Sequence, residues 1–154
     1  MTDRMAIRRA ATDDLAALLR LYEQLSAGNA GTDLDRAATA LEQLLRTPNA
    51  TLLVAERGGT VVGTVTLVLV PNLTHNARPW AQVENMVTDA SVRGAGVGRE
   101  LMVECLRLAR EAGCYKVQLQ SANTRATPGN DAHGFYRHLG FEPSSAGFRY
   151  YFED

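Results

Sequence analysis

The chain has 154 residues, 45% of them hydrophobic and 21% charged, and a formal net charge of −1. This length predicts a single domain over 1–154 with a core of its own. Because the charge is almost balanced, the sequence excludes a strong general attraction for nucleic acid or an anionic membrane, and we expect neither as a partner.

The cysteines and the apolar segments indicate a cytoplasmic protein. The spacing of Cys105 and Cys114 matches no common metal or redox motif, so we expect reduced thiols and no metal. The N-terminal MTDRMAIRR lacks the apolar core of a signal peptide. The longest apolar run, Val65–Pro71, is far too short to span a membrane.

The first third of the sequence predicts one strand followed by two helices. Met5–Ala10 has the pattern of a short strand. Thr12 offers a cap oxygen for a helix whose leucines recur at helical spacing, and Gly28 ends that helix. Thr32 and Asp35 resemble a capping box for the second helix. The two helices are expected to cover either a sheet alone or a binding site as well.

The middle of the chain predicts a hairpin followed by another strand. Thr51–Glu56 and Thr60–Val70 are apolar and β-branched, and Arg57-Gly58-Gly59 between them is a hairpin signal. The second of these strands is apolar on both faces, so we expect it to be central in the sheet. A polar loop with two prolines, Pro71–Pro79, leads to a further strand, Trp80–Thr88.

The last third predicts a crossover helix, Gly96–Ala112, between two strands that must therefore be parallel. Tyr115–Ser121 is the strand after it, and the loop Ala122–Gly129 leads to a short helix, Asp131–Leu139. Phe148–Phe152 is a final aromatic strand. The complete pattern predicts an α/β fold with a mixed, mostly antiparallel sheet of six to seven strands and helices on both faces.

A glycine-rich turn lies between the strand that ends at Thr88 and the crossover helix. Bare backbone N–H groups and the positive end of the helix dipole make such a turn an anion site. The turn lacks the lysine of a nucleotide-hydrolysing phosphate loop and the spacing of a dinucleotide fingerprint. Arg93 adds a bidentate cation suited to a pyrophosphate. We therefore favour anion binding over a glycine turn without a ligand.

The run Arg93–Gly98 resembles the Arg/Gln-x-x-Gly-x-Gly/Ala signature of the GNAT superfamily of N-acetyltransferases. Val83–Asp89 looks like the fourth strand of that family, and Ala132–Phe141 looks like its later Ala-x-x-Phe-Tyr-x-x-x-Gly-Phe motif. The order of the predicted elements also fits, so the resemblance covers nearly the whole chain. It implies the GNAT fold, in which the fourth and fifth strands splay apart, and acetyl-CoA as co-substrate.

The resemblance also implies which residues hold acetyl-CoA. The pantetheine arm is expected to run along the backbone of Met86, Val87 and Thr88, with Leu119–Ser121 on the opposite wall of the splay. Backbone N–H groups of the glycine turn are expected to cradle the pyrophosphate. The residues expected there are Arg93, Gly94, Ala95, Gly96, Val97, Gly98 and Arg99.

Two side chains are candidates for the chemistry of acetyl transfer. The acceptor amine must lose a proton, and Glu84, expected to be half-buried, is the candidate base; its alternative role is to attract the ammonium or pair with an arginine. Gln120 stands where some family members carry a glutamate base. Tyr136 matches the acid of the family, and its alternative role is a core tyrosine. The backbone N–H of Val87 is the expected oxyanion donor, if the strand bulges there.

The acceptor is expected to be a small amine, with an anionic group as one option. Val83–Asn85 with Gly113–Val117 looks like the glucosamine-phosphate N-acetyltransferases. Asp131–Tyr136 with Phe148-Arg149 looks like the aminoalkylphosphonate N-acetyltransferases. The alternatives are acetylation of a protein lysine or N-terminal amine, and a non-catalytic acetyl-CoA-binding module. The sequence does not determine the oligomeric state, and a homodimer is one option. Available cations are Arg78, Arg125 and Arg149.

Overall fold

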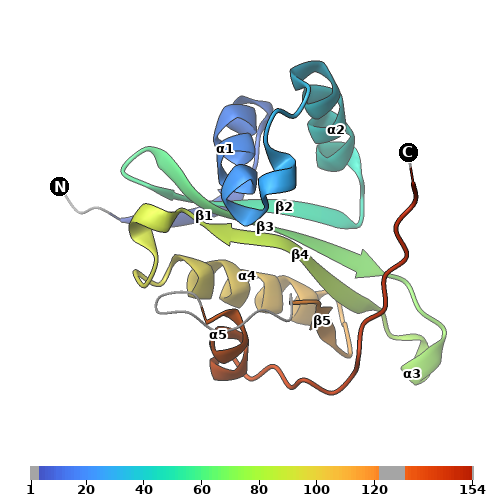
Figure 1. Ribbon diagram of the computed structural model, residues 1–154. Coiled ribbons are helices and arrows are strands. Elements are labelled where there is room, and N and C mark those ends of the chain that lie inside the picture. Colours follow the sequence, from blue (N-terminus) through green and yellow to red (C-terminus); the bar gives the residue numbers. More distant parts are fainter. Residues whose placement is uncertain (1–3, 122–130, 154) are drawn as a thin grey trace. The chain divides into compact units, whose positions relative to one another are not determined.

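The computed structural model describes residues 4–121 and 131–153. Contacts divide the chain into two compact units, Met1–Leu119 and Gln120–Asp154. The larger unit contains the sheet and most of the helices, whereas the smaller contains one short helix (Figure 1). The predicted loop Ala122–Gly129, with Arg125, lies outside the described residues.

A five-stranded sheet, in the order β1-β2-β3-β4-β5, forms the larger unit. All neighbours are antiparallel except β4 and β5, which are parallel, so the mixed sheet is confirmed. The strands are β1 (Met5–Arg9), β2 (Ala50–Arg57), β3 (Thr60–Val70), β4 (Trp80–Thr88) and β5 (Val117–Leu119). The described residues thus form five strands rather than the predicted six to seven.

The strand number is lower because the strand expected over Phe148–Phe152 has no regular structure. The strand expected over Tyr115–Ser121 is present but is shortened to β5 (Val117–Leu119). Phe148 and Phe152 are each 90% exposed. Aromatic residues favour strands because they pack against neighbouring strands. The sequence shows this preference, but it cannot show whether a neighbouring strand is present.

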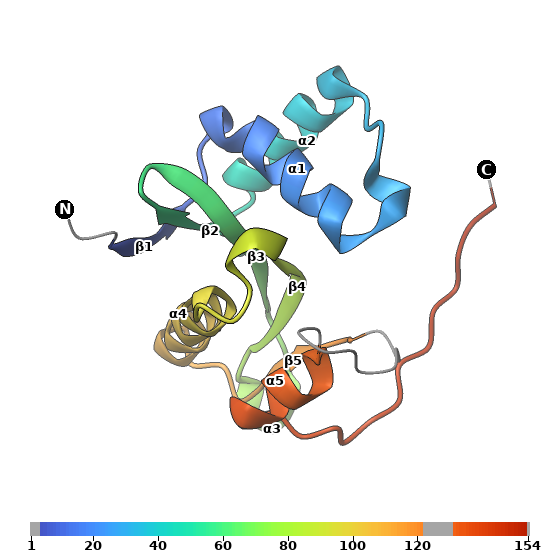
Figure 2. The ribbon, with the colours of Figure 1, turned by 60° about the vertical axis from the view of Figure 1, so that its left-hand side comes forward.

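Helices cover both faces of the sheet, as predicted (Figures 1 and 2). One face carries α1 (Leu15–Leu25) and α2 (Leu34–Arg46), whose leucines form a buried cluster with Leu52 of β2. The other face carries α4 (Val97–Glu111). α1 ends before Gly28, because Ser26 already has an extended backbone.

Both of the first two helices begin on an aspartate that was not the predicted cap. Asp14 precedes α1, where Thr12 was expected to cap, but its carboxylate accepts no N–H of that helix and instead accepts the Ala11 N–H at 2.8 Å. Asp33 caps α2 by accepting the N–H three residues later at 2.8 Å, in place of Thr32. The segment before each helix contains threonine and aspartate side chains that could act as the cap, and spacing alone did not show which of them would do so.

Gly63 of β3 allows α4 to pack close to the sheet. A Cβ added to Gly63 would lie 2.8 Å from Val97 Cγ1 and 3.1 Å from Leu101 Cδ1. Both side chains are fully buried, and Val97 is the first residue of α4. The missing side chain of Gly63 therefore fixes the distance between the sheet and the N-terminus of α4.

Gly63→Ala is expected to lower the free energy of unfolding by about 1–3 kcal/mol, because the added methyl group overpacks this contact. Urea denaturation measures the change. Gly28→Ala is the control, since a Cβ there would meet only Ser26 Oγ, at 3.7 Å. Equal stability of the two variants would contradict the close packing of α4.

Arg8 joins two carboxylates near the start of α1. It donates to Asp14 at 2.8 and 2.9 Å and to Glu56 at 2.9 and 2.8 Å. Asp14 is buried, and the hydrogen bond from Arg8 lowers the pKa of its carboxyl group, against an opposing effect of burial. Because the unfolded value is about 3.9, this stabilisation is complete above about pH 4 and is lost as the pH falls through the lowered folded value.

Asp14→Asn is expected to cost about 2 kcal/mol at pH 7, since it removes a charged hydrogen-bond acceptor from a buried position. The difference from the wild type should shrink as the pH falls below about 4. Urea denaturation between pH 3 and pH 8 measures both effects. Asp13→Asn, at an exposed neighbouring position, is the control. A wild-type stability of Asp14→Asn at pH 7 would show that the ion pair contributes nothing.

The predicted loop Pro71–Pro79 contains one short turn, α3 (Thr74–Ala77). His75 and Asn76 have φ values of 53° and 60°, so this turn is left-handed. The His75 ring stacks on Tyr115 with 3.9 Å between the centroids. The stack and the turn order the end of the loop next to the segment that precedes β5.

Candidate functional site

β4 carries a bulge in the middle of its length. The β3–β4 register changes from Thr64 opposite Val87 to Thr66 opposite Glu84, so β4 contains one residue more than β3 in this interval. Asn85 has a φ of 52°, a left-handed conformation that asparagine adopts more readily than most residues. The extra residue bends the strand and redirects its backbone groups.

Beyond the bulge, β4 has an unpaired edge. β5 pairs with Ala81–Val83 and ends at Leu119. Among residues 4–121 and 131–153, no strand pairs with Glu84–Thr88 on the side of β4 that faces away from β3. An unpaired strand edge presents N–H and C=O groups that an extended ligand can use. The predicted pantetheine-binding residues Met86–Thr88 lie on this stretch.

The pairing of β4 with β3 bears on the expected oxyanion donor. Asp89 N–H donates to Val62 O of β3 at 2.8 Å. Because hydrogen-bonded positions alternate along an antiparallel strand, the Val87 N–H points to β3 as well. The donor role expected for Val87 stays a prediction. Met86 belongs to the bulge between the hydrogen-bonded positions, so its N–H is the nearest alternative.

The residues after β4 form a capped turn that is held by α1. Asp89 Oδ1 accepts the Ser91 N–H at 2.9 Å and the Ser91 hydroxyl at 2.7 Å, and these bonds lower the pKa of Asp89. Ala90 N–H donates to Gln24 Oε1 at 2.8 Å. Arg20 lies 3.9 Å from Asp89. Arg20 and Gln24 were not among the residues predicted for the site, although their spacing places them on one face of α1.

The glycine turn joins this capped segment to α4. Gly94 and Gly96 have φ values of 80° and 84°, and a Cβ on either would meet nothing within 4 Å, so glycine is required for conformation rather than for space. The first helical bond runs from Glu100 N–H to Gly96 O at 3.1 Å. The N–H groups from Gly96 to Arg99 therefore have no helical acceptor, which makes an anion site.

The structure brings the predicted turn residues together at the N-terminus of α4. Arg93 and Arg99 are exposed, and the glycines and Ala95 between them add no bulk. Val97 differs, because its side chain is buried against the position of Gly63 and can offer only its backbone N–H. The turn thus combines N–H donors with two cations.

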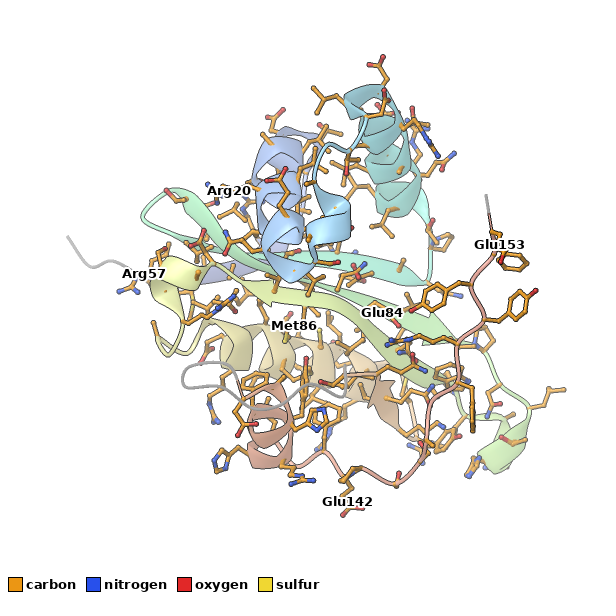
Figure 3. The ribbon with its side chains drawn as sticks, viewed as in Figure 1. Arg20, Arg57, Glu84, Met86, Glu142 and Glu153 are labelled. Atoms are coloured by element: carbon orange, nitrogen blue, oxygen red, sulfur yellow. The ribbon has the colours of Figure 1, made fainter. Side chains whose placement is uncertain are left out.

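Glu84 lies on β4 next to the bulge, where Figure 3 labels it together with Met86. Its side chain is exposed rather than half-buried as expected. Thr66 lies directly opposite and is hydrogen-bonded to Tyr22 of α1, so Glu84 is on the α1 face of the sheet. Burial raises the pKa of the Tyr22 hydroxyl, which stays neutral. Because its side chain is exposed, Glu84 places an accessible negative charge beside the unpaired edge.

The smaller unit contains α5 (Ala132–His138). Asp131 caps this helix by accepting the Gly134 N–H at 2.9 Å. Gly140, with a φ of 93°, ends it in a left-handed conformation. Both ends of this short helix are thus fixed by local hydrogen bonds.

Tyr136 of α5 lies in an aromatic cluster. Its ring makes edge contacts with Phe135 at 5.2 Å and Phe141 at 6.0 Å between centroids, and its carbonyl accepts the Phe141 N–H at 3.0 Å. Burial raises the pKa of the Tyr136 hydroxyl. The phenol therefore keeps its proton at neutral pH and can donate it.

Other candidate residues have structural roles or no assigned contact. Arg78 donates to the carbonyls of Gly113 and Cys114 at 3.1 and 3.0 Å, which fixes the turn after α4. Cys105 is buried, as predicted, and burial raises the pKa of its thiol to about 12. Both cysteines are free. Gln120 and Arg149 belong to the smaller unit.

In residues 4–121 and 131–153, no group of three His, Cys, Asp or Glu side chains is arranged to hold a metal ion. In the same residues, no helix has the length and apolar character needed to cross a membrane.

Comparisons with known proteins fit this geometry. The profile of the Acetyltransferase (GNAT) family matches residues 15–141, which run across the boundary between the two units. Glucosamine 6-phosphate N-acetyltransferase from Trypanosoma brucei brucei is 37% identical over 83 residues, covering 54% of this chain but only 52% of that protein. Aminoalkylphosphonate N-acetyltransferase from Salmonella typhimurium is 28% identical over 138 residues, covering 90% and 85%. A solved structure from Agrobacterium tumefaciens, named as a candidate acetyltransferase, has a TM-score of 0.87 and 36% identity, covering 95% and 99%.

Proposed function

Because the chain belongs to the Acetyltransferase (GNAT) family, we propose that it transfers the acetyl group of acetyl-CoA directly to a primary amine of a small molecule. The observation that carries the proposal is the continuity of the unpaired β4 edge with the glycine turn and the N-terminus of α4. An extended arm and a pyrophosphate at its end match these two surfaces. We further propose that both units together form one domain over 1–154.

Acetyl-CoA supplies an activated thioester, and the residues proposed to hold it are all in the larger unit. At Met86, Val87 and Thr88, the edge of β4 that faces away from β3 lies where a pantetheine arm could add as a further strand. The N–H groups at the start of α4 suit the pyrophosphate. Arg93 and Arg99 add cations at the same turn. No metal has a part in this proposal.

Three groups of the chain take part in the proposed transfer. Glu84 removes a proton from the acceptor ammonium, directly or through water. The Met86 N–H stabilises the negative charge that develops on the thioester oxygen as the new nitrogen–carbon bond forms. Tyr136 gives its proton to the sulfur as the carbon–sulfur bond breaks. The attacking nitrogen loses its second proton to solvent as the amide forms, and the proton on Glu84 returns to Tyr136 through solvent. The cycle therefore converts the ammonium and acetyl-CoA into the amide, the free CoA thiol and one released proton.

We propose an acceptor amine that carries an anionic group. Support comes from the names of two relatives, which act on glucosamine 6-phosphate and on aminoalkylphosphonates. Both compounds combine a primary amine with a phosphorus-containing anion. The exposed Glu84 carboxylate beside the edge suits the ammonium end of such a molecule.

A thiol-release assay with acetyl-CoA and a panel of amines tests the proposal. The panel contains glucosamine 6-phosphate, aminoethylphosphonate, glucosamine and a lysine peptide. Faster release with the two phosphorus-containing amines is expected. Release with the peptide alone would favour protein acetylation, and tight acetyl-CoA binding without release would favour a binding module.

A further inference from the structure

Two glutamines connect β5 to the Glu84 carboxylate. Gln118 Nε2 donates to Gln82 Oε1 at 3.0 Å, and Gln82 Nε2 donates to Glu84 Oε1 at 3.0 Å. Gln82 and Gln118 are direct partners in the parallel pairing, and Glu84 follows Gln82 on the same face of β4. The chain of hydrogen bonds thus ends at the position where the two strands cease to pair.

The donor and acceptor in each of these hydrogen bonds follow from the chemistry of the Glu84 carboxylate. A carboxylate only accepts hydrogen bonds, so Gln82 must present its NH₂ group to Glu84. Its oxygen then faces Gln118 and must accept, so Gln118 also has to present its NH₂ group. Neither amide can be reversed without losing a bond. The two glutamines therefore hold one oxygen of Glu84 as an acceptor and leave the other oxygen for a ligand.

We propose that Gln82 and Gln118 are positioning residues that hold Glu84 in the orientation needed to take the proton of the acceptor amine. The inference rests on the proposed function, in which Glu84 is the base. An exposed glutamate has several free rotamers, and fixing one of them before the substrate binds removes an entropic cost from the reaction. Among the described side chains, Gln82 is the one that donates to Glu84.

The second glutamine acts only through the first. Gln118 reaches Gln82 but has no described bond to Glu84. Without Gln118, the Gln82 amide can rotate and lose its fixed direction. Without Gln82, Gln118 can no longer influence the carboxylate. This order predicts that the effects of two substitutions are not additive.

Steady-state kinetics of Gln82→Leu, Gln118→Leu and the double variant test the inference. Gln82→Leu should lower kcat by about tenfold to a hundredfold, the range for losing a hydrogen bond to a charged group, with the KM for acetyl-CoA unchanged. Gln118→Leu should have a smaller effect, and the double variant should equal Gln82→Leu alone. Additive losses, or wild-type turnover of Gln82→Leu, would overturn the inference.

Controls separate this inference from the proposed function and from folding. Gln43→Leu makes the same chemical change at an exposed position on α2 and should leave kcat unchanged. If Gln82→Leu does not fold, Gln82→Met replaces it, and urea denaturation reports the stability of each variant. Absence of turnover in the wild type would refute the proposed function. A slow Glu84→Gln variant with a fully active Gln82→Leu variant would refute the positioning role alone.

Discussion

Glu84→Gln is expected to lower kcat/KM for the acceptor amine by about a hundredfold or more, the range for removal of a general base. The affinity for acetyl-CoA should stay at the wild-type value, because the glycine turn is untouched. Glutamine keeps the shape of the side chain but cannot take a proton. The exposed position of Glu84 beside the unpaired edge gives it access to a bound amine.

The pH–rate profile of this variant provides a second measurement. A free alkyl amine has a pKa of about 10.4, so without a base the rate should follow the small neutral fraction. The residual rate of Glu84→Gln is therefore expected to rise about tenfold per pH unit towards pH 10. Glu23→Gln, on the exposed surface of α1, is the control. A wild-type profile for Glu84→Gln would exclude Glu84 as the base.

Tyr136→Phe is expected to lower kcat by about a hundredfold, because the departing thiolate loses its proton donor. The variant keeps the ring that contacts Phe135 and Phe141, so α5 should remain intact. Burial raises the pKa of the Tyr136 hydroxyl, which keeps the donor protonated throughout the neutral range. The dissociation constant of acetyl-CoA should not change, because the residues proposed to hold acetyl-CoA are untouched.

Calorimetric titration with acetyl-CoA and steady-state kinetics separate these two effects. Tyr150→Phe is the matched control, since Tyr150 is 84% exposed and belongs to the same unit. An unchanged kcat of Tyr136→Phe would assign the tyrosine to the aromatic cluster alone. Weaker acetyl-CoA binding with unchanged kcat would assign it to the binding of the co-substrate instead.

Local patterns in the sequence predicted most of the larger unit. The run from Trp80 to Ala112 contains its own strand, turn and helix signals, and each of these elements is present. A bulge was considered only through resemblance and only at Val87, whereas the structure has it at Asn85, and the direction of the Val87 N–H depends on the register with β3. Register is a property of two strands, so one strand cannot reveal it. Gln118 is likewise 36 residues from Gln82, and its role becomes visible only in the sheet.

The final aromatic segment shows that a strong local preference alone does not predict a strand. Phe148–Phe152 has a strong strand preference, but the described residues give it no strand partner. The cap of α2 is made by Asp33 and not by the adjacent Thr32 for a related reason. Propensity ranks residue types, whereas the outcome depends on which side chain reaches a free N–H.

The unpaired edge of β4 also bears on the solubility of the protein. Strand edges with free N–H and C=O groups are templates on which other chains can assemble, and natural proteins protect them against aggregation. The left-handed residue Asn85 interrupts the flat edge at this point. A straight strand of a second molecule cannot follow such a bend over its full length, whereas a narrow, flexible ligand can. The irregularity is therefore expected to hinder strand addition by another chain while it leaves the edge open to the proposed co-substrate.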